Sequence, residues 1–349
     1  MEELSLLILG AGWTATFLIP LLQSRKIPFA ATTTSGRPVA GVPTIPFKLD
    51  PSAPEDETRS AIAALPRARY ILITFPLTGK GSSKLLIDAY ESTHRTAAAA
   101  AAAAASASAT TAQHQFRFIQ LGSTGIWQPH GSRTRTTTTT TTSTPPPPPP
   151  PPPTTTTTTT TSSDPWRTRH SPHSTSTPRA VAEDELLALG GCVLNLAGLW
   201  GGARNPRHWV GRVAATKEAV RAKTSLHLVH GVDVARAVVA VVDDGADEGL
   251  LQGEGRWERA GRGQRWMVTD GWVYDWWGLL AGWAEVRDGE EVGEGDSPGV
   301  SEQARWVFEL MGEEGVRALP RAMEVLGRCY DSREFWETWG LVPLKGRAG

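Results

Sequence analysis

The fold is decided close to the start of the sequence, where the apolar run Leu4-Ser-Leu-Leu-Ile-Leu9 leads directly into Gly10-Ala-Gly-Trp-Thr-Ala15. An apolar run of this kind is typical of a parallel strand that is buried on both faces. The turn has the pattern G-x-G-x-x-A: Gly10 permits a tight turn, Gly12 lets the backbone approach a pyrophosphate, and Ala15 keeps the next helix close to the sheet. The helix, expected over 13–24, points its N-terminus at the phosphate charge. The segment therefore predicts a dinucleotide-binding turn made by Gly10, Ala11, Gly12, Trp13, Thr14 and Ala15.

The same residues allow a second interpretation, because positions 4–22 are almost wholly apolar and have about the length of a membrane span. A signal peptide carries basic residues before its apolar run, whereas Glu2 and Glu3 precede this one. Small and turn-forming residues at 10–15 also stand where a span prefers Leu or Ile. We therefore expect a strand and a helix here, and no membrane segment.

The end of the next expected strand, over 28–34, bears on the choice of cofactor. An NAD site usually places Asp or Glu there to hold the ribose 2′-hydroxyl, but this sequence has Thr33-Thr-Ser-Gly-Arg37. The hydroxyls of Thr34 and Ser35 and the guanidinium of Arg37 suit a 2′-phosphate, because arginine donates forked, charge-assisted hydrogen bonds. The pattern favours NADP over NAD, with the alternative that Arg37 is only a solvated loop residue.

Further strands and helices alternate at the spacing of βαβ units. Their repetition predicts an α/β fold with a Rossmann-type, doubly wound parallel sheet, whose ligands bind at the carboxyl ends of the strands. Strands are expected over 43–49, 70–75 and 116–121, and helices over 54–65 and 82–95. The expected loops at the carboxyl ends contain Thr74, Phe75 and Pro76 and, after the last of these strands, Ser123 and Thr124.

The composition of the 349-residue chain excludes several classes of function. Its 35 basic and 36 acidic residues leave no excess charge for a nucleic acid or an anionic membrane surface. The two cysteines, Cys192 and Cys329, are too few for a disulfide framework and are not spaced as a zinc or redox pair. We expect no metal site, a reducing and cytoplasmic location, and a small molecule of unknown identity as the binding partner.

Two low-complexity segments interrupt the pattern: alanine fills 97–105, and runs of Thr and Pro fill much of 136–161. Neither has a periodic apolar face that would offset the entropy of ordering. We expect a disordered insertion over 132–178 and a shorter, Ala-rich one over 97–112, which leaves roughly 285 residues for a packed core. The expected organisation is a first part of the Rossmann domain over 1–131, the insertion over 132–178, the rest of the Rossmann domain over 179–245 and a small, Trp-rich C-terminal substrate subdomain over 246–349.

Six segments, in this order, resemble the extended short-chain dehydrogenase/reductases, also called the NAD(P)-dependent epimerase/dehydratase superfamily. The resemblance implies the Rossmann fold, an NAD(P) cofactor, an active-site serine at Ser123 with Thr124 beside it, and a homodimer formed through helices that flank the sheet. The segments are GAGWTA (10–15), LITFP (72–76), FIQLGSTGIW (118–127), NLAGLWGGARNP (195–206), LVHGVDVA (228–235) and WMVTDG (266–271).

One departure from this family concerns its chemistry. The family uses a tyrosine that is activated by a lysine four residues later, since the lysine charge lowers the phenol pKa. None of the four tyrosines has a lysine at that spacing. Arg179-Ala-Val-Ala-Glu183 stands in place of the pair, and Arg179 is expected to bind an anion or to pair with Glu183. His130 or His208 could replace the missing acid.

Two functions remain open from the sequence. The first is an NADP-dependent oxidoreductase, or an epimerase-like enzyme, that transfers hydride to an unknown carbonyl or hydroxyl compound. The second is a catalytically silent NADP-binding protein that acts as a sensor or scaffold. Both predict the same cofactor site and differ only in turnover.

Overall fold

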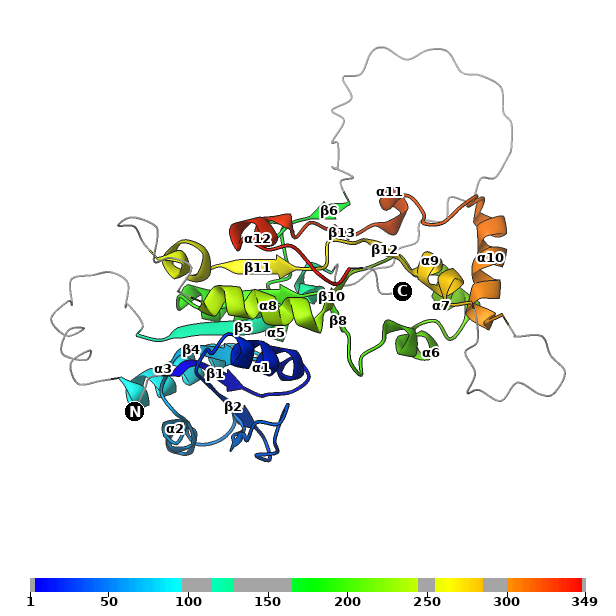
Figure 1. Ribbon diagram of the computed structural model, residues 1–349. Coiled ribbons are helices and arrows are strands. Elements are labelled where there is room, and N and C mark those ends of the chain that lie inside the picture. The colour runs from blue at the N-terminus through cyan, green and yellow to red at the C-terminus, as the bar shows by residue number, and fades with distance from the viewer. Residues whose placement is uncertain (1–3, 96–114, 129–164, 244–254, 285–299, 347–349) are drawn as a thin grey trace, which may run out of the picture.

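The computed structural model describes residues 4–95, 115–128, 165–243, 255–284 and 300–346 (Figure 1). A seven-stranded, wholly parallel sheet lies at its centre, with the strand order β11-β7-β5-β4-β1-β2-β3. The predicted α/β fold with a doubly wound parallel sheet is confirmed. The sheet strands are β1 (Leu4–Leu9), β2 (Phe29–Thr33), β3 (Ile45–Pro46), β4 (Ala68–Ile73), β5 (Arg117–Ser123), β7 (Cys192–Leu196) and β11 (Arg265–Val268).

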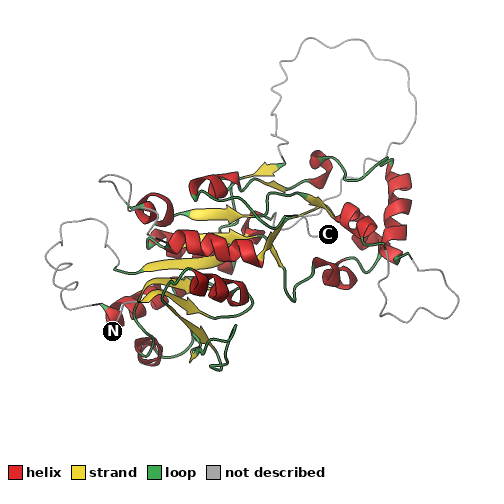
Figure 2. Cartoon of the chain, in the orientation of Figure 1, coloured by secondary structure: helices red, strands yellow, loops and turns green. Residues whose placement is uncertain are grey.

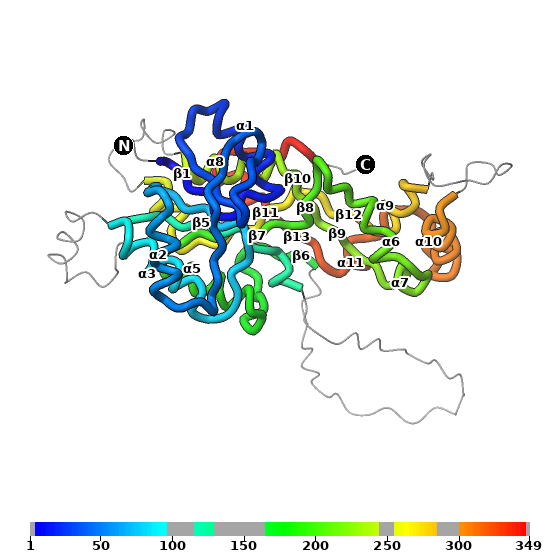
Figure 3. The backbone as a smooth tube through the Cα atoms, turned by 90° about the horizontal axis from the view of Figure 1, so that it is seen from below, coloured from blue at the N-terminus to red at the C-terminus, as the bar shows by residue number. Residues whose placement is uncertain are grey.

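Helices cover both faces of this sheet (Figure 3). The burial of the β1 side chains explains this arrangement. Leu6 and Ile8 are fully buried against one face, with helices α1 and α8, whereas Leu7 and Leu9 are fully buried against the other, with α2, α3 and α5. Alternation along a strand sends successive side chains to opposite faces, so the run reads as continuously apolar. The helices of these two layers are α1 (Ala15–Ser24) and α8 (Gly231–Val242), then α2 (Glu55–Ala63), α3 (Ser82–His94) and α5 (Pro178–Ala188).

A smaller group of elements extends beyond the carboxyl ends of the strands (Figure 2). Four of its helices pack around a core in which Trp277 is fully buried and Trp276 nearly so. Three short strand pairs, β8–β10, β9–β12 and β6–β13, form separate two-stranded sheets. The strands are β6 (Trp166–Arg167), β8 (Gly198–Trp200), β9 (Ser225–Leu226), β10 (Leu228–His230), β12 (Tyr274–Asp275) and β13 (Cys329–Tyr330). The remaining helices are η1 (Thr124–Trp127), η2 (Pro206–Trp209), α6 (Val210–Val213), α7 (Lys217–Arg221), η4 (Trp257–Gly261), α9 (Trp276–Gly282), α10 (Glu302–Glu314), α11 (Met323–Leu326) and α12 (Arg333–Thr338).

The structure corrects three expectations. The insertion expected over 132–178 ends earlier, because residues 165–178 are ordered by pairing of β6 with β13 and by the N-terminus of α5. The strand expected over 43–49 is only the two-residue β3. The range 246–349 does not lie wholly outside the sheet, since β11 pairs with β7 and α12 packs on the sheet core through Phe335 and Trp336. The expected insertion over 97–112, and positions 132–164 of the other, lie outside the described residues.

Candidate functional site

The glycine turn between β1 and α1 is held by hydrogen bonds from the neighbouring strand. Gly10 N donates to Thr32 Oγ1 over 3.0 Å, and Ala11 N donates to Thr32 O over 2.6 Å. Gly10 has a φ of +85°, and a Cβ at this position would lie 2.9 Å from Phe75 and from Thr74. Both the backbone conformation and the space therefore require glycine there. Gly12 differs, because a Cβ would meet only Gly10 O at 3.8 Å.

The helix that follows begins with unused backbone donors. Thr14 is its N-cap and makes no side-chain capping hydrogen bond. Among the described residues, the N–H groups of Trp13 and Thr14 have no acceptor, whereas Gly12 N donates to Gly10 O over 2.7 Å. Free N–H groups at a helix N-terminus attract an anion. The N–H groups of Trp13 and Thr14 are therefore available to an anion at this turn.

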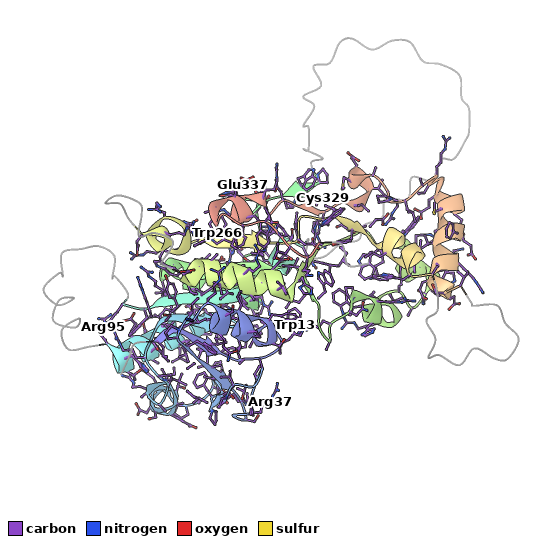
Figure 4. The ribbon with its side chains drawn as sticks, in the orientation of Figure 1. Trp13, Arg37, Arg95, Trp266, Cys329 and Glu337 are labelled. Carbon is purple, nitrogen blue, oxygen red and sulfur yellow. The ribbon has the colours of Figure 1, made fainter. Side chains whose placement is uncertain are left out.

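A cavity of about 370 Å³ opens beside this turn. Its floor is the glycine turn and Phe75, and its outer wall is the end of β2 together with the segment after β3. Arg37 and Lys48, both exposed, bring two positive charges to this wall. Lys48 was not predicted, because it enters the site only when β3 pairs with β2. Figure 4 shows Trp13 and Arg37 at the end of the sheet toward which its strands point.

The other residues expected at the cofactor site divide into three groups. Thr34 and Phe75 line the cavity, as does Thr33, and Thr74 Oγ1 donates to the carbonyls of Leu9 and Gly10. Ser35 and Pro76 are exposed and do not belong to the cavity wall. Trp13, Thr14 and Ala15 border the turn at the start of α1 and are likewise not part of the wall.

Trp13 ties the turn to the smaller group of elements. Its Nε1 donates to Gly201 O over 3.1 Å, and the guanidinium of Arg204 lies 4.5 Å from the centre of its ring. Both partners lie just after β8, and Gly201 is 188 residues from Trp13 in the sequence. The contact therefore holds the β8 loop against the edge of the glycine turn.

Ser123 and Thr124 lie where the sequence predicts, at the carboxyl end of β5. Ser123 Oγ accepts a hydrogen bond from Gly125 N over 3.1 Å and so caps η1. A hydroxyl has one proton to donate as well as its lone pairs, and this contact leaves the Ser123 proton available. Thr124 is buried, and its carbonyl accepts a hydrogen bond from the hydroxyl of Tyr330 over 2.9 Å.

The segment that replaces the tyrosine–lysine pair is arranged differently from expectation. Glu183 is fully buried and pairs with Arg265, at 3.3 Å, rather than with Arg179. Its Oε2 also accepts from Asn195 Nδ2 over 2.8 Å. Burial is the largest influence on this carboxyl and raises its pKa, while Asn195 and Arg265 act to lower it. Glu183 is therefore part of the packing between α5 and the sheet and is not accessible to a substrate.

Of the two histidines considered as a substitute acid, His208 lies in η2, next to α6, and His130 lies outside the described residues. Within the described ranges, no group of three potential metal-ligating side chains is found. No helix in that part of the chain is long and apolar enough to cross a membrane.

The strand order 3-2-1-4-5-7-11, with a glycine turn after β1, defines a Rossmann-type fold. Comparison with protein-family models and with curated protein sequences gave no match. Solved structures, in contrast, match over nearly the whole chain. One is a functionally unknown conserved protein from Silicibacter pomeroyi, with 16% identity, coverage of 98% of this chain and 94% of the other, and a TM-score of 0.51.

Two further solved structures share the fold and hold a nicotinamide cofactor. MoeE5 in complex with UDP-glucuronic acid and NAD is 12% identical, with coverage of 99% and 95% and a TM-score of 0.50. A short-chain dehydrogenase/reductase superfamily protein from Agrobacterium tumefaciens with bound NAD is 8% identical, with coverage of 98% and 93% and a TM-score of 0.50. The fold implied by the sequence resemblance is therefore confirmed: this chain has the fold of the short-chain dehydrogenase/reductases.

Proposed function

We propose that the protein binds NADP at the turn after β1 and uses it in hydride transfer to or from a carbonyl or hydroxyl compound. The observation that carries the proposal is the combination of the cavity beside Gly10 and Gly12 with the free N–H groups of Trp13 and Thr14. A dinucleotide needs both features, because its pyrophosphate takes the helix N-terminus and its adenosine half takes the cavity.

The preference for NADP rests on charge at the outer wall of the cavity. Arg37 and Lys48 are two cations in the lining, and the described lining contains no carboxylate. A 2′-phosphate gains from both cations, whereas a 2′-hydroxyl usually requires an Asp or Glu acceptor. The alternative that Arg37 is only a solvated loop residue is weakened by Lys48, which reaches the same wall from the segment after β3.

The reaction is supported by the hydroxyl of Ser123. When bound, the nicotinamide supplies or accepts the hydride. Ser123 Oγ keeps its proton free while it accepts from Gly125 N, so it can donate to a substrate carbonyl oxygen and polarise it. Thr124 is held by Tyr330 through its backbone and orients this end of β5.

A second candidate is a catalytically silent NADP-binding protein. It is favoured by one observation: Glu183, at the place of the family's lysine, is buried with Arg265 and cannot activate an acid. The two candidates separate in one experiment. Oxidation of NADPH is followed with a panel of aldehydes, ketones and sugar-derived carbonyl compounds, for the native protein and for Ser123→Ala. Turnover that falls in Ser123→Ala supports the enzyme, whereas tight NADPH binding without turnover across the panel supports the silent protein.

A further inference from the structure

A second cavity, of about 570 Å³, lies beyond the carboxyl end of β5. Its wall begins with Ile126 and Trp127 of η1, which directly follows Ser123 and Thr124, and continues through residues 172–174 and 326–328. Arg167 and Arg328 both line it, and among the described residues no carboxylate does. The cavity therefore has two arginines and no described carboxylate in its lining, and it adjoins the end of the strand that carries the proposed serine.

The pairing of β6 with β13 places Tyr330 directly opposite Arg167. Arg328 comes directly before β13, and both arginines line the cavity. The Arg328 guanidinium lies 5.2 Å from the centre of the Tyr330 ring. Cys329, labelled in Figure 4, marks the place of β13 in the fold.

In the part of the chain that the structure describes, Arg328 has no acidic partner for its charge. Its Nε is buried and has no hydrogen-bond partner, and within the described residues no carboxylate forms an ion pair with it. A buried guanidinium N–H without an acceptor is costly, so an incoming anion would relieve that cost. This feature distinguishes Arg328 from Arg333, which pairs with Asp331 at 2.6 Å.

His173 lines the same wall. Its Nε2 lies 2.9 Å from Arg265 Nη1 and 3.2 Å from Asp184 Oδ1. The same Arg265 nitrogen lies 2.9 Å from Asp184 Oδ1, which neutralises the carboxylate nearest to His173.

We propose that this cavity binds the phosphate group of a phosphorylated substrate, held between the guanidinium groups of Arg167 and Arg328. Two cations match the dianionic charge of a phosphate ester, and planar guanidinium groups bind its oxygens in a forked geometry. The cavity is larger than a phosphate ion and has a volume typical of small-molecule sites, and Trp127 and Leu326 give it apolar wall for the organic part. The assignment rests on the proposed function, since the carbonyl of such a substrate would lie toward Ser123.

The test is titration calorimetry with inorganic phosphate at constant ionic strength. Binding is measured for the native protein, Arg328→Gln, Arg167→Gln and the matched control Arg333→Gln. Arg333 carries the same charge and lies on the same segment, but its side chain is 80% exposed and outside this cavity. We expect each cavity variant to weaken phosphate binding about tenfold or more, and the control to bind like the native protein. Acetate is titrated in parallel, and binding as strong as that of phosphate would overturn the assignment of a phosphate group.

Two further variants keep the result interpretable. Arg37→Gln removes charge from the cofactor cavity, so phosphate binding that falls there, and not in Arg328→Gln, would overturn the proposal. Arg328→Lys retains the charge and is expected to recover part of the affinity, which excludes misfolding as the cause of the loss. NADPH is titrated into the same set. Unchanged NADPH binding in Arg328→Gln is expected, whereas phosphate binding without any NADPH binding would refute the proposed cofactor and leave the phosphate site standing.

Discussion

The two glycines of the turn after β1 are expected to respond in opposite ways to the same change. Gly10→Ala adds a methyl group at a φ of +85°, where its Cβ would lie 2.9 Å from Phe75 and Thr74. Gly12→Ala adds the same group at a position with ordinary φ, where the nearest protein atom is Gly10 O at 3.8 Å. The first methyl group therefore disturbs the protein, and the second occupies space that we assign to the pyrophosphate.

The magnitudes follow from these contacts. For Gly10→Ala, the left-handed backbone costs about 1–2 kcal/mol, and the overpacking adds about 1–3 kcal/mol. For Gly12→Ala, the free energy of unfolding should change by less than about 1 kcal/mol, since alanine also restricts the unfolded chain. NADPH binding to Gly12→Ala should weaken at least about tenfold, which corresponds to about 1.4 kcal/mol, and Gly12→Val should weaken it further.

Urea unfolding of both variants measures the free energy of unfolding, and titration calorimetry measures the affinity for NADPH. The account requires that Gly12→Ala unfolds like the native protein yet binds NADPH poorly. If Gly12→Ala binds NADPH with native affinity, the pyrophosphate does not lie over this turn. If it is destabilised as strongly as Gly10→Ala, its effect on binding says nothing about contact with the cofactor.

Three other predictions concern charge. Arg37→Gln and Lys48→Gln should each weaken NADPH binding more than NADH binding, by roughly 1–2 kcal/mol because both side chains are exposed and screened; equal losses for the two cofactors in calorimetry would refute the 2′-phosphate assignment. Burial raises the pKa of Asp270 to about 6 and lowers that of His227 to about 4. Ionisation of Asp270 therefore lowers the free energy of unfolding by about 3 kcal/mol as the pH rises through 4–6. Protonation of His227 lowers it by about 3 kcal/mol as the pH falls through 6.5–4. Relative to the native protein, urea unfolding over this window should show stability that falls with rising pH in His227→Asn and stability that falls with falling pH in Asp270→Asn. Variant profiles that run parallel to the native profile would contradict both assignments. Arg321→Met should lower the free energy of unfolding by about 3–5 kcal/mol, because it leaves the buried carboxylate of Asp275, now 2.7 Å from Arg321, without its partner. A loss below about 1 kcal/mol in urea unfolding would show that this ion pair does not stabilise the fold.

Local patterns were sufficient to predict the first half of the sheet. The run at 4–9 and the turn at 10–15 each depend on residues that are adjacent in sequence, and the structure places β1 and α1 there. The edge strand β11 was assigned to the wrong side of a domain boundary for a physical reason. Its pairing with β7 joins residues about 70 positions apart, and a short buried strand carries no signal for the sheet it joins.

The candidate site shows the same division. Gly10, Gly12 and Arg37 were found because the motif and the strand end specify them. Lys48 and Arg328 were missed, because each reaches its cavity through a strand pair of only two residues, β2–β3 and β6–β13 respectively. Sequence reasoning also extended the Thr/Pro insertion through residues 165–178, whose Ser, Pro and His content resembles that of a loop although β6 and His173 are held by long-range contacts.

The measurement that tests the central claim most directly is calorimetric titration of the full chain with NADPH and, separately, with NADH. The account predicts micromolar binding of NADPH and distinctly weaker binding of NADH, because Arg37 and Lys48 face the position of the 2′-phosphate. Equal affinity for both would contradict the NADP assignment and leave a nicotinamide cofactor in place. Binding of neither would show that this Rossmann-type fold does not use a nicotinamide cofactor, and the proposed hydride transfer would fall with it.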